Sequence, residues 1–110
     1  GVPYTALPMA TCISLDQNLP MLICRKEAKD YGTKKQIEGI FSKGQDCLIV
    51  EDVITTGGSV LKIIEILEKE GLQVSDVAVL VDREEGGRET LANKGYHLHS
   101  VFTLSDFAKE

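Results

Sequence analysis

The apolar residues of this chain gather in short blocks that polar, glycine-containing turns separate. Short blocks of this kind predict strands, because they are too short for helices and turn residues bound them. The run from Cys47 to Val50 has no polar alternation, which is typical of a strand buried on both faces of a parallel sheet. The predicted strands are Leu19 to Cys24, Cys47 to Val50, Val77 to Val81 and His97 to Thr103, with a strand or connector from Ile37 to Phe41 and a turn from Ser42 to Asp46.

Helical spacing is clearest after Val60. Apolar residues recur on one face up to Leu67, charged residues occupy the other, and Gly71 is placed to end the helix. Shorter helices are predicted from Tyr4 to Leu15, from Thr90 to Lys94 and from Leu104 to Lys109. Because strands alternate with helices, we expect an α/β fold with a mostly parallel sheet flanked by helices.

The richest chemistry follows the strand that ends at Val50. Glu51 and Asp52 come first, and the small polar loop from Thr55 to Ser59 then leads into the helix. Ligands of open α/β sheets bind at the carboxyl ends of strands, and glycine-rich loops at helix N-termini suit phosphate. The two acids can accept hydrogen bonds from vicinal sugar hydroxyls or hold a hydrated divalent cation. The ligand predicted for this stretch is therefore a sugar phosphate.

Two other strand ends carry charge. Arg25 and Lys26 open a basic segment that extends to Lys35, and Asp82 and Arg83 follow the strand Val77 to Val81. A solvated surface loop is the ordinary interpretation of a charge run. Because we expect Arg25 and Lys26 at the same sheet edge as the two acids, the basic segment is instead a candidate for binding a polyanion and closing over it.

Composition narrows the class of protein. At 110 residues the chain is expected to form one domain, and its net charge of −5 argues against nucleic acid as the main partner. No apolar stretch approaches the ~20 residues of a membrane span. The odd number of cysteines, Cys12, Cys24 and Cys47, predicts reduced core thiols of a cytoplasmic protein. His97 and His99 alternate with Leu98 and are expected to be solvated.

Four motifs together resemble the orotate phosphoribosyltransferases, a branch of the type I phosphoribosyltransferases. Leu48 to Ser59 resembles the signature for phosphoribosyl pyrophosphate (PRPP), and Arg25 to Gly32 looks like the mobile catalytic loop. Asp82 to Gly87 is similar to the orotate-binding turn, and Gly1 to Ala6 to the pyrophosphate loop. Within this family the likeness is greatest to the N-terminal domain of animal UMP synthases.

The resemblance implies a role for each matching residue. Glu51 and Asp52 would bind the ribose hydroxyls, with Lys29 and Asp52 as catalytic residues. Thr55 and Arg83 would contact orotate, and Tyr4 and Thr5 belong to the pyrophosphate loop. The full PRPP-binding set is Arg25, Lys26, Lys29, Tyr31, Glu51, Asp52, Val53, Ile54, Thr55, Thr56, Gly57, Gly58 and Ser59.

The resemblance also implies a reaction and partners. Orotate and PRPP would give orotidine 5′-monophosphate and diphosphate in UMP biosynthesis, with Mg²⁺ held by PRPP and waters and with no direct protein ligand. A homodimer is implied, in which the segment from Arg25 to Lys35 acts in the neighbouring subunit's site. Alternatives are a purine phosphoribosyltransferase and a non-catalytic PRPP-binding regulatory module.

This chain departs from the family pattern in three respects. Many bacterial members have histidine where Tyr31 stands and lysine where Thr5 stands, so proton transfer and pyrophosphate contact are expected to differ there. The family's N-terminal hood and first strand have no counterpart in these residues. We therefore expect residues 1–110 to be the C-terminal, PRPP-binding part of a phosphoribosyltransferase domain.

Overall fold

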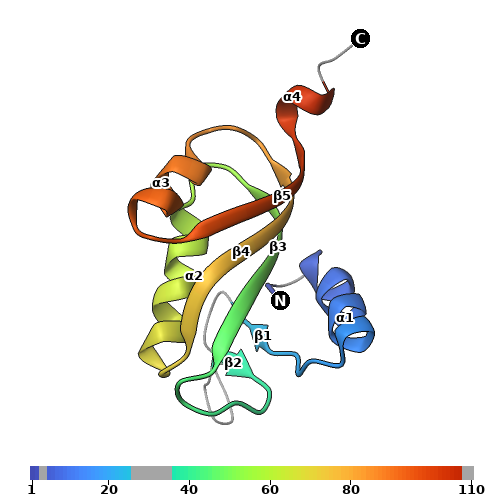
Figure 1. The fold of residues 1–110 in the computed structure, drawn as a ribbon, viewed down its shortest axis with the longest axis vertical. Coiled ribbons are helices and arrows are strands. Elements are labelled where there is room, and N and C mark those ends of the chain that lie inside the picture. The colour runs from blue at the N-terminus through green and yellow to red at the C-terminus, as the bar shows by residue number, and fades with distance from the viewer. Residues whose placement is uncertain (3–4, 26–35, 108–110) are drawn as a thin grey trace.

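The structure is a computed structural model that describes residues 1–2, 5–25 and 36–107. Three parallel strands form its centre, with helices on both sides (Figure 1). The elements are α1 (Ala6–Gln17), β1 (Ile23–Cys24), β2 (Ile37–Glu38), β3 (Asp46–Ile54), α2 (Gly58–Lys69), β4 (Gln73–Asp82), α3 (Gly87–Asn93), β5 (His97–Thr103) and α4 (Leu104–Phe107). This confirms the predicted α/β class.

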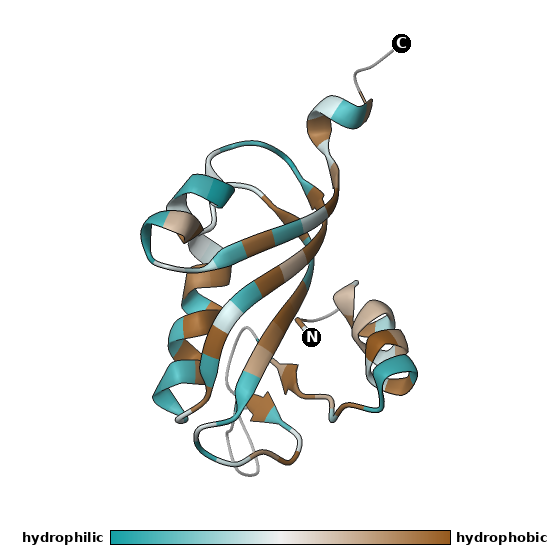
Figure 2. Cartoon of the chain, in the orientation of Figure 1, coloured by the Kyte–Doolittle hydropathy of each residue, from teal (hydrophilic) through white to brown (hydrophobic). Residues whose placement is uncertain are grey.

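The main sheet has the strand order β3-β4-β5, and both neighbouring pairs are parallel. Helices α2 and α3 lie on one side of it and α1 lies on the other, beside β3 (Figure 1). The larger core forms between the sheet and α2, where Ile63 and Ile64 pack with Val77 and Leu98. Brown apolar positions accordingly alternate with polar ones along the strands and α2 (Figure 2).

Both faces of β3 are covered near its middle. Ile49 belongs to the core with α2, whereas Val50 packs with Ala6 and Ala10 of α1. Successive side chains of a strand point to opposite faces, so the two residues bury both sides as predicted. Leu48 is an exception, because it remains about half exposed at 47%.

Several predicted elements were shorter than the elements in the structure. The strand expected to end at Val50 continues to Ile54, because its parallel register with β4 runs on from Glu51 opposite Val79 to Ile54 opposite Asp82. Glu51 and Asp52 therefore lie within the strand and not beyond it. The helix expected from Thr90 begins at Gly87, whereas β5 has the predicted bounds.

The prediction of a sheet strand from Leu19 to Cys24 was wrong. Only Ile23–Cys24 is a strand, and it pairs antiparallel with β2 in a separate two-stranded sheet. Gly1 and Val2 lie between this strand and β3, since the Cys24 N–H donates to the Gly1 carbonyl (3.0 Å) and the Val2 N–H to the Val50 carbonyl (3.2 Å). The end of β1 is therefore linked to β3 through Gly1 and Val2, and the link reaches β3 at Val50, the residue before Glu51.

Cys12 is exposed, which corrects the expectation of three core thiols, while Cys24 is buried and Cys47 partly buried. In the part of the chain that the structure describes, no helix has the length and apolar character needed to cross a membrane.

Candidate active site

Glu51 and Asp52 lie near the carboxyl end of β3. Glu51 is buried, and its Oε1 accepts a hydrogen bond from the Asp52 N–H at 2.9 Å. The Asp52 Oδ1 accepts from the Val53 N–H at 2.8 Å. These bonds hold both carboxylates close to the backbone at the carboxyl end of the sheet, where α/β proteins bind ligands.

The loop after β3, residues 55–59, brings hydroxyls and backbone donors to the same place. Thr55, Thr56 and Ser59 are exposed, and Gly57 takes a φ of 96°, a left-handed conformation that favours glycine. Helix α2 then begins at Gly58. The N–H groups of its first turn have no intrahelical acceptor and are available to a ligand at this loop. Such an N-terminus attracts phosphate.

A cavity of about 160 Å³ joins the acids to this loop. Acceptors on one side and N–H and hydroxyl donors on the other suit a ligand with hydroxyls at one end and a phosphate at the other. Its lining residues are Glu51, Asp52, Val53, Ile54, Thr55, Gly57, Ser59 and Val60. Ile54 can contribute only through its backbone, because its side chain is in the core.

The turn after β4, residues 82–87, is hydrogen-bonded to the end of β3 and to the 55–59 loop. The Arg83 N–H donates to the Ile54 carbonyl and the Gly87 N–H donates to the Thr55 carbonyl, both at 3.0 Å. A Cβ on Gly87 would lie 2.7 Å from the Thr55 carbonyl oxygen, so only glycine allows this approach. The structure therefore places the backbone of Arg83 beside the end of β3, and Thr55 lines the same cavity as Asp52.

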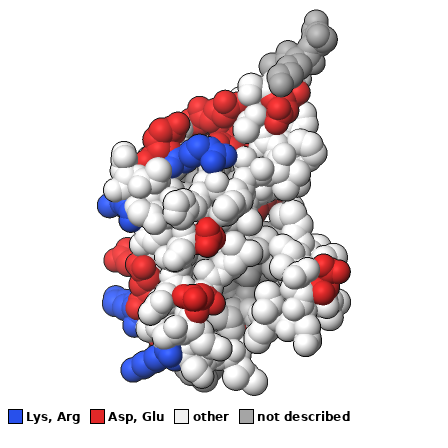
Figure 3. Space-filling view, viewed as in Figure 1, with Lys and Arg blue, Asp and Glu red and all other residues white. Residues whose placement is uncertain are grey.

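The Arg83 side chain is about half exposed and pairs through Nε with the Glu85 carboxylate at 3.1 Å. Acidic side chains gather at this end of the molecule, over α3, the 82–87 turn and α4 (Figure 3). These acids repel an anionic ligand, whereas the guanidinium of Arg83 is a cationic group that can pair with a carboxylate.

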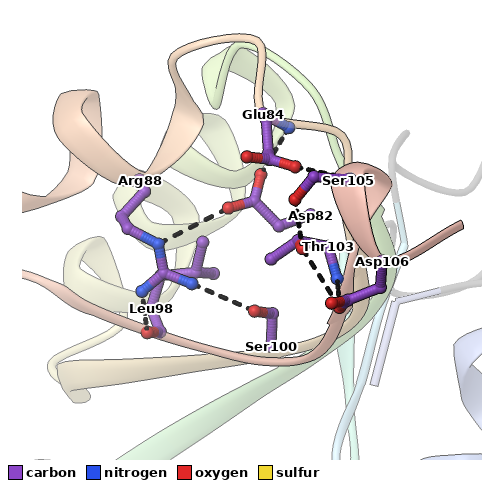
Figure 4. A network of polar contacts seen from close by, with 8 residues as sticks. All are labelled: Asp82, Glu84, Arg88, Leu98, Ser100, Thr103, Ser105 and Asp106. Carbon is purple, nitrogen blue, oxygen red and sulfur yellow. Dashed lines mark hydrogen bonds and ion pairs between the residues drawn. The ribbon is translucent and has the colours of Figure 1, made fainter. Parts of the chain in front are cut away.

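The sequence did not single out Arg88, and its part in this turn is a finding of the structure. Its guanidinium joins the buried carboxylate of Asp82 to two positions on β5, Leu98 and Ser100 (Figure 4). The one signal in the sequence was an arginine placed just after the Gly86–Gly87 pair, in the first turn of a helix, where a cation is otherwise disfavoured.

Arg25 follows β1 and forms an ion pair with Glu38 at 3.0 Å. Its Nε finds no hydrogen-bond partner among the described residues. Thr5, at the start of α1, is exposed. The other predicted residues of the basic loop and the pyrophosphate loop, Tyr4, Lys26, Lys29 and Tyr31, lie outside the described residues.

The remaining titratable candidates take no part in this site. His97 and His99 are exposed, as predicted, and the His99 Nε2 lies 2.9 Å from an Asp76 carboxylate oxygen. Burial raises the pKa of the Cys24 and Cys47 thiols, which keeps them protonated and poorly nucleophilic.

Comparison with known proteins points to one family. A family model described as the phosphoribosyl transferase domain matches residues 1–103. Uridine 5′-monophosphate synthase of Bos taurus is 59% identical over 96% of this chain, which spans 22% of that protein. Orotate phosphoribosyltransferase of Chlamydia felis is 49% identical over 99% of this chain, which spans 54% of it. The chain thus spans about half or less of the length of these relatives.

A solved structure shows the same fold. Orotate phosphoribosyltransferase of Mycobacterium tuberculosis, in complex with PRPP, superposes with a TM-score of 0.81 at 32% identity. The superposition covers 99% of this chain and 63% of that one. Because the family model covers nearly the whole sequence and the fold agrees, the chain belongs to the phosphoribosyl transferase domain family.

Proposed function

We propose that this chain is the PRPP-binding part of an orotate phosphoribosyltransferase, acting in UMP biosynthesis. The observation that carries the proposal is the pair of backbone hydrogen bonds that joins the 82–87 turn to Ile54, the last residue of β3, and to Thr55 of the 55–59 loop. Through it, a group that recognises a carboxylate lies beside a loop that suits a phosphate. The similarity to orotate phosphoribosyltransferases, one of them solved with PRPP, supports the same assignment.

Arg83 favours orotate over a purine as the second substrate. Orotate carries a carboxylate that a guanidinium can hold with two parallel hydrogen bonds, whereas adenine and hypoxanthine carry none. With a purine at this turn, the Arg83 guanidinium would keep its ion pair with Glu85 and gain no charged contact with the base. Thr55, whose carbonyl accepts from Gly87, is then positioned to present its hydroxyl to the base.

The reaction requires charge stabilisation more than covalent chemistry. The bond between C1 of PRPP and diphosphate breaks, a ring nitrogen of orotate bonds to C1 and loses its proton to solvent, and negative charge develops on the leaving group. In our proposal Arg25, Lys26 and Lys29 bind that charge and Lys29 donates a proton to the leaving diphosphate. Glu51 and Asp52 hold the ribose hydroxyls while C1 becomes electron-poor.

The donor set also fits Mg²⁺. The carboxylates of Glu51 and Asp52 border the cavity, and hard oxygen groups of this kind suit Mg²⁺ or the waters it retains. When bound to the substrate's diphosphate, Mg²⁺ would neutralise charge on the leaving group. We propose that PRPP and waters supply its ligands.

Three further features belong to the proposal. We propose a homodimer in which the segment from Arg25 to Lys35 enters the partner's site, and a cytoplasmic location. The share of each relative that the chain covers supports residues 1–110 as part of a larger domain.

The test is a steady-state assay of orotate consumption by the full-length protein with PRPP and Mg²⁺, with adenine and hypoxanthine as competing bases. We expect turnover of orotate alone. Turnover of a purine alone would replace the proposal with the purine alternative.

The regulatory alternative differs in what it demands of Lys29. If the protein only senses PRPP, Lys29→Ala leaves its function intact. If it is the enzyme, the same change costs about 2–4 kcal/mol of transition-state stabilisation, typical for one electrostatic group. PRPP binding without orotate turnover, unchanged by Lys29→Ala, would establish the regulatory module.

A further inference from the structure

Arg88 connects three parts of the structure that lie around the 82–87 turn. Its Nη1 donates to the Leu98 carbonyl at 2.9 Å and its Nη2 to the Ser100 hydroxyl at 3.0 Å. Its Nε lies 3.5 Å from Oδ2 of Asp82. Every nitrogen of the guanidinium thus has a partner, and the residue joins the start of α3 to β5 and to the end of β4 (Figure 4).

Asp82 links Arg88 to the 82–87 turn. Its carboxylate is only 3% exposed, so it needs a compensating charge, which Arg88 supplies. Its other oxygen, Oδ1, accepts from the Glu84 N–H at 2.8 Å. Glu84 has a φ of 59°, a left-handed conformation that a glutamate adopts only when neighbouring contacts hold it there.

The far side of the turn is held as well. The Glu84 carboxylate accepts from the Ser105 N–H at 2.7 Å, at the start of α4 (Figure 4). Arg83 lies between the two attachments, with its N–H bonded to Ile54 and its side chain toward solvent. The backbone of Arg83 is therefore held by its own N–H bond to Ile54 and, on either side, by Arg88 through Asp82 and by Glu84.

We propose that Arg88 is a positioning residue for the carboxylate-bearing substrate: it keeps the 82–87 turn in the conformation that places Arg83 beside the 55–59 loop. The inference rests on the proposed function for the identity of that substrate. It assigns Arg88 a larger effect on orotate affinity than on PRPP affinity, because the 55–59 loop is also held at its two ends by β3 and α2. Arg88 itself touches neither substrate.

The test compares Arg88→Met, Arg88→Lys and the control Lys62→Met in the full-length protein. Lys62 is exposed on α2, so its replacement removes the same charge without contacting the turn. In Arg88→Met we expect the KM for orotate to rise about tenfold or more, since hydrogen bonds of a charged group are lost, while the KM for PRPP stays within about twofold. Arg88→Lys should recover part of the loss, because lysine can reach one partner but cannot bridge three.

A second measurement does not depend on enzyme activity. Amide hydrogen exchange by NMR reports directly on the N–H groups of Arg83, Glu84 and Gly87, with the Val79 N–H in the middle of β4 as internal reference. In Arg88→Met these three amides should exchange about tenfold faster relative to Val79, and in Lys62→Met they should not change.

The outcomes separate this inference from the proposed function. Unchanged exchange in the turn, or equal rises in the KM of both substrates, would overturn the positioning role of Arg88. A wild-type protein that binds PRPP but does not bind orotate would instead refute the proposed function, and with it the substrate assigned to Arg83. An unfolded Arg88→Met protein would be recognised by loss of the Val79 reference, and Arg88→Lys would then decide through the same two readouts.

Discussion

The contact between Gly87 and Thr55 is the point where the two halves of the proposed site meet, and Gly87→Ala perturbs it with a single methyl group. A Cβ at this position would lie 2.7 Å from the Thr55 carbonyl oxygen and 2.8 Å from Cγ1 of Ile54. The side chain of Ile54 can rotate, but the carbonyl belongs to the backbone. The 82–87 turn must therefore move away from the 55–59 loop.

The cost follows from two losses. Forcing a methyl group into a packed contact typically costs about 1–3 kcal/mol. Displacing the turn also weakens the 3.0 Å hydrogen bond from the Gly87 N–H to the Thr55 carbonyl, worth about 1 kcal/mol. Gly87→Ala should therefore lower the free energy of unfolding by about 2–4 kcal/mol.

Gly58→Ala is the matched control. Gly58 begins α2 as Gly87 begins α3, neither has a positive φ, and the nearest atom to a Cβ on Gly58 is Oγ1 of Thr56 at 4.0 Å. In a helix alanine is favoured over glycine by up to about 1 kcal/mol, so Gly58→Ala should be neutral or stabilising. Urea denaturation of both variants measures the difference. Equal stability of the two would refute the steric argument and the closeness of the two loops.

The remaining predictions concern Glu84 in the 82–87 turn, the core and the proposed ribose site. Hydrogen bonds from the N–H and hydroxyl of Ser105 lower the pKa of Glu84, so its contribution to stability is present above about pH 4.5 and disappears as pH falls through its lower folded pKa. Glu84→Gln should remove this part of the pH dependence from the urea midpoint measured between about pH 3 and 5; an unchanged profile would contradict the Glu84–Ser105 bond. Ile64→Ala should cost about 2–5 kcal/mol in the same denaturation assay, whereas Leu15→Ala, at a residue 78% exposed, should stay within about 0.5 kcal/mol. Asp52→Asn should weaken PRPP binding by about 10–100-fold in calorimetry with Mg²⁺, and an unaffected Kd would remove Asp52 from the ribose site.

Local sequence patterns predicted the elements well where one face of the element is buried. His97 and His99 alternate with Leu98 at the start of β5, and the structure has the predicted bounds, His97–Thr103. The ends of β3 and α3 were missed because pairing with a neighbouring strand and a close glycine contact decide them. The two-residue β1 was overpredicted, since an apolar run cannot show which strand, if any, lies beside it.

The candidate site divides in the same way. Glu51, Asp52, Thr55 and Arg83 were named as candidates from the sequence, because α/β proteins bind ligands near the carboxyl ends of strands. Arg88 was not, because its partners Leu98 and Ser100 lie across α3 on another strand and only folding brings them within hydrogen-bond distance.

The sequence by itself determined the class of fold and the chemistry offered at each strand end. Hydrophobic periodicity and side-chain type are local properties, and they suffice for both. The tertiary structure alone decided how those strand ends are joined: which carbonyl the Arg83 N–H reaches, why Gly87 has no room for a side chain, and which cation compensates Asp82. The first two contacts join segments far apart in the chain, and the third is fixed because Arg88 also binds β5, so all three depend on the packing of the sheet and its helices.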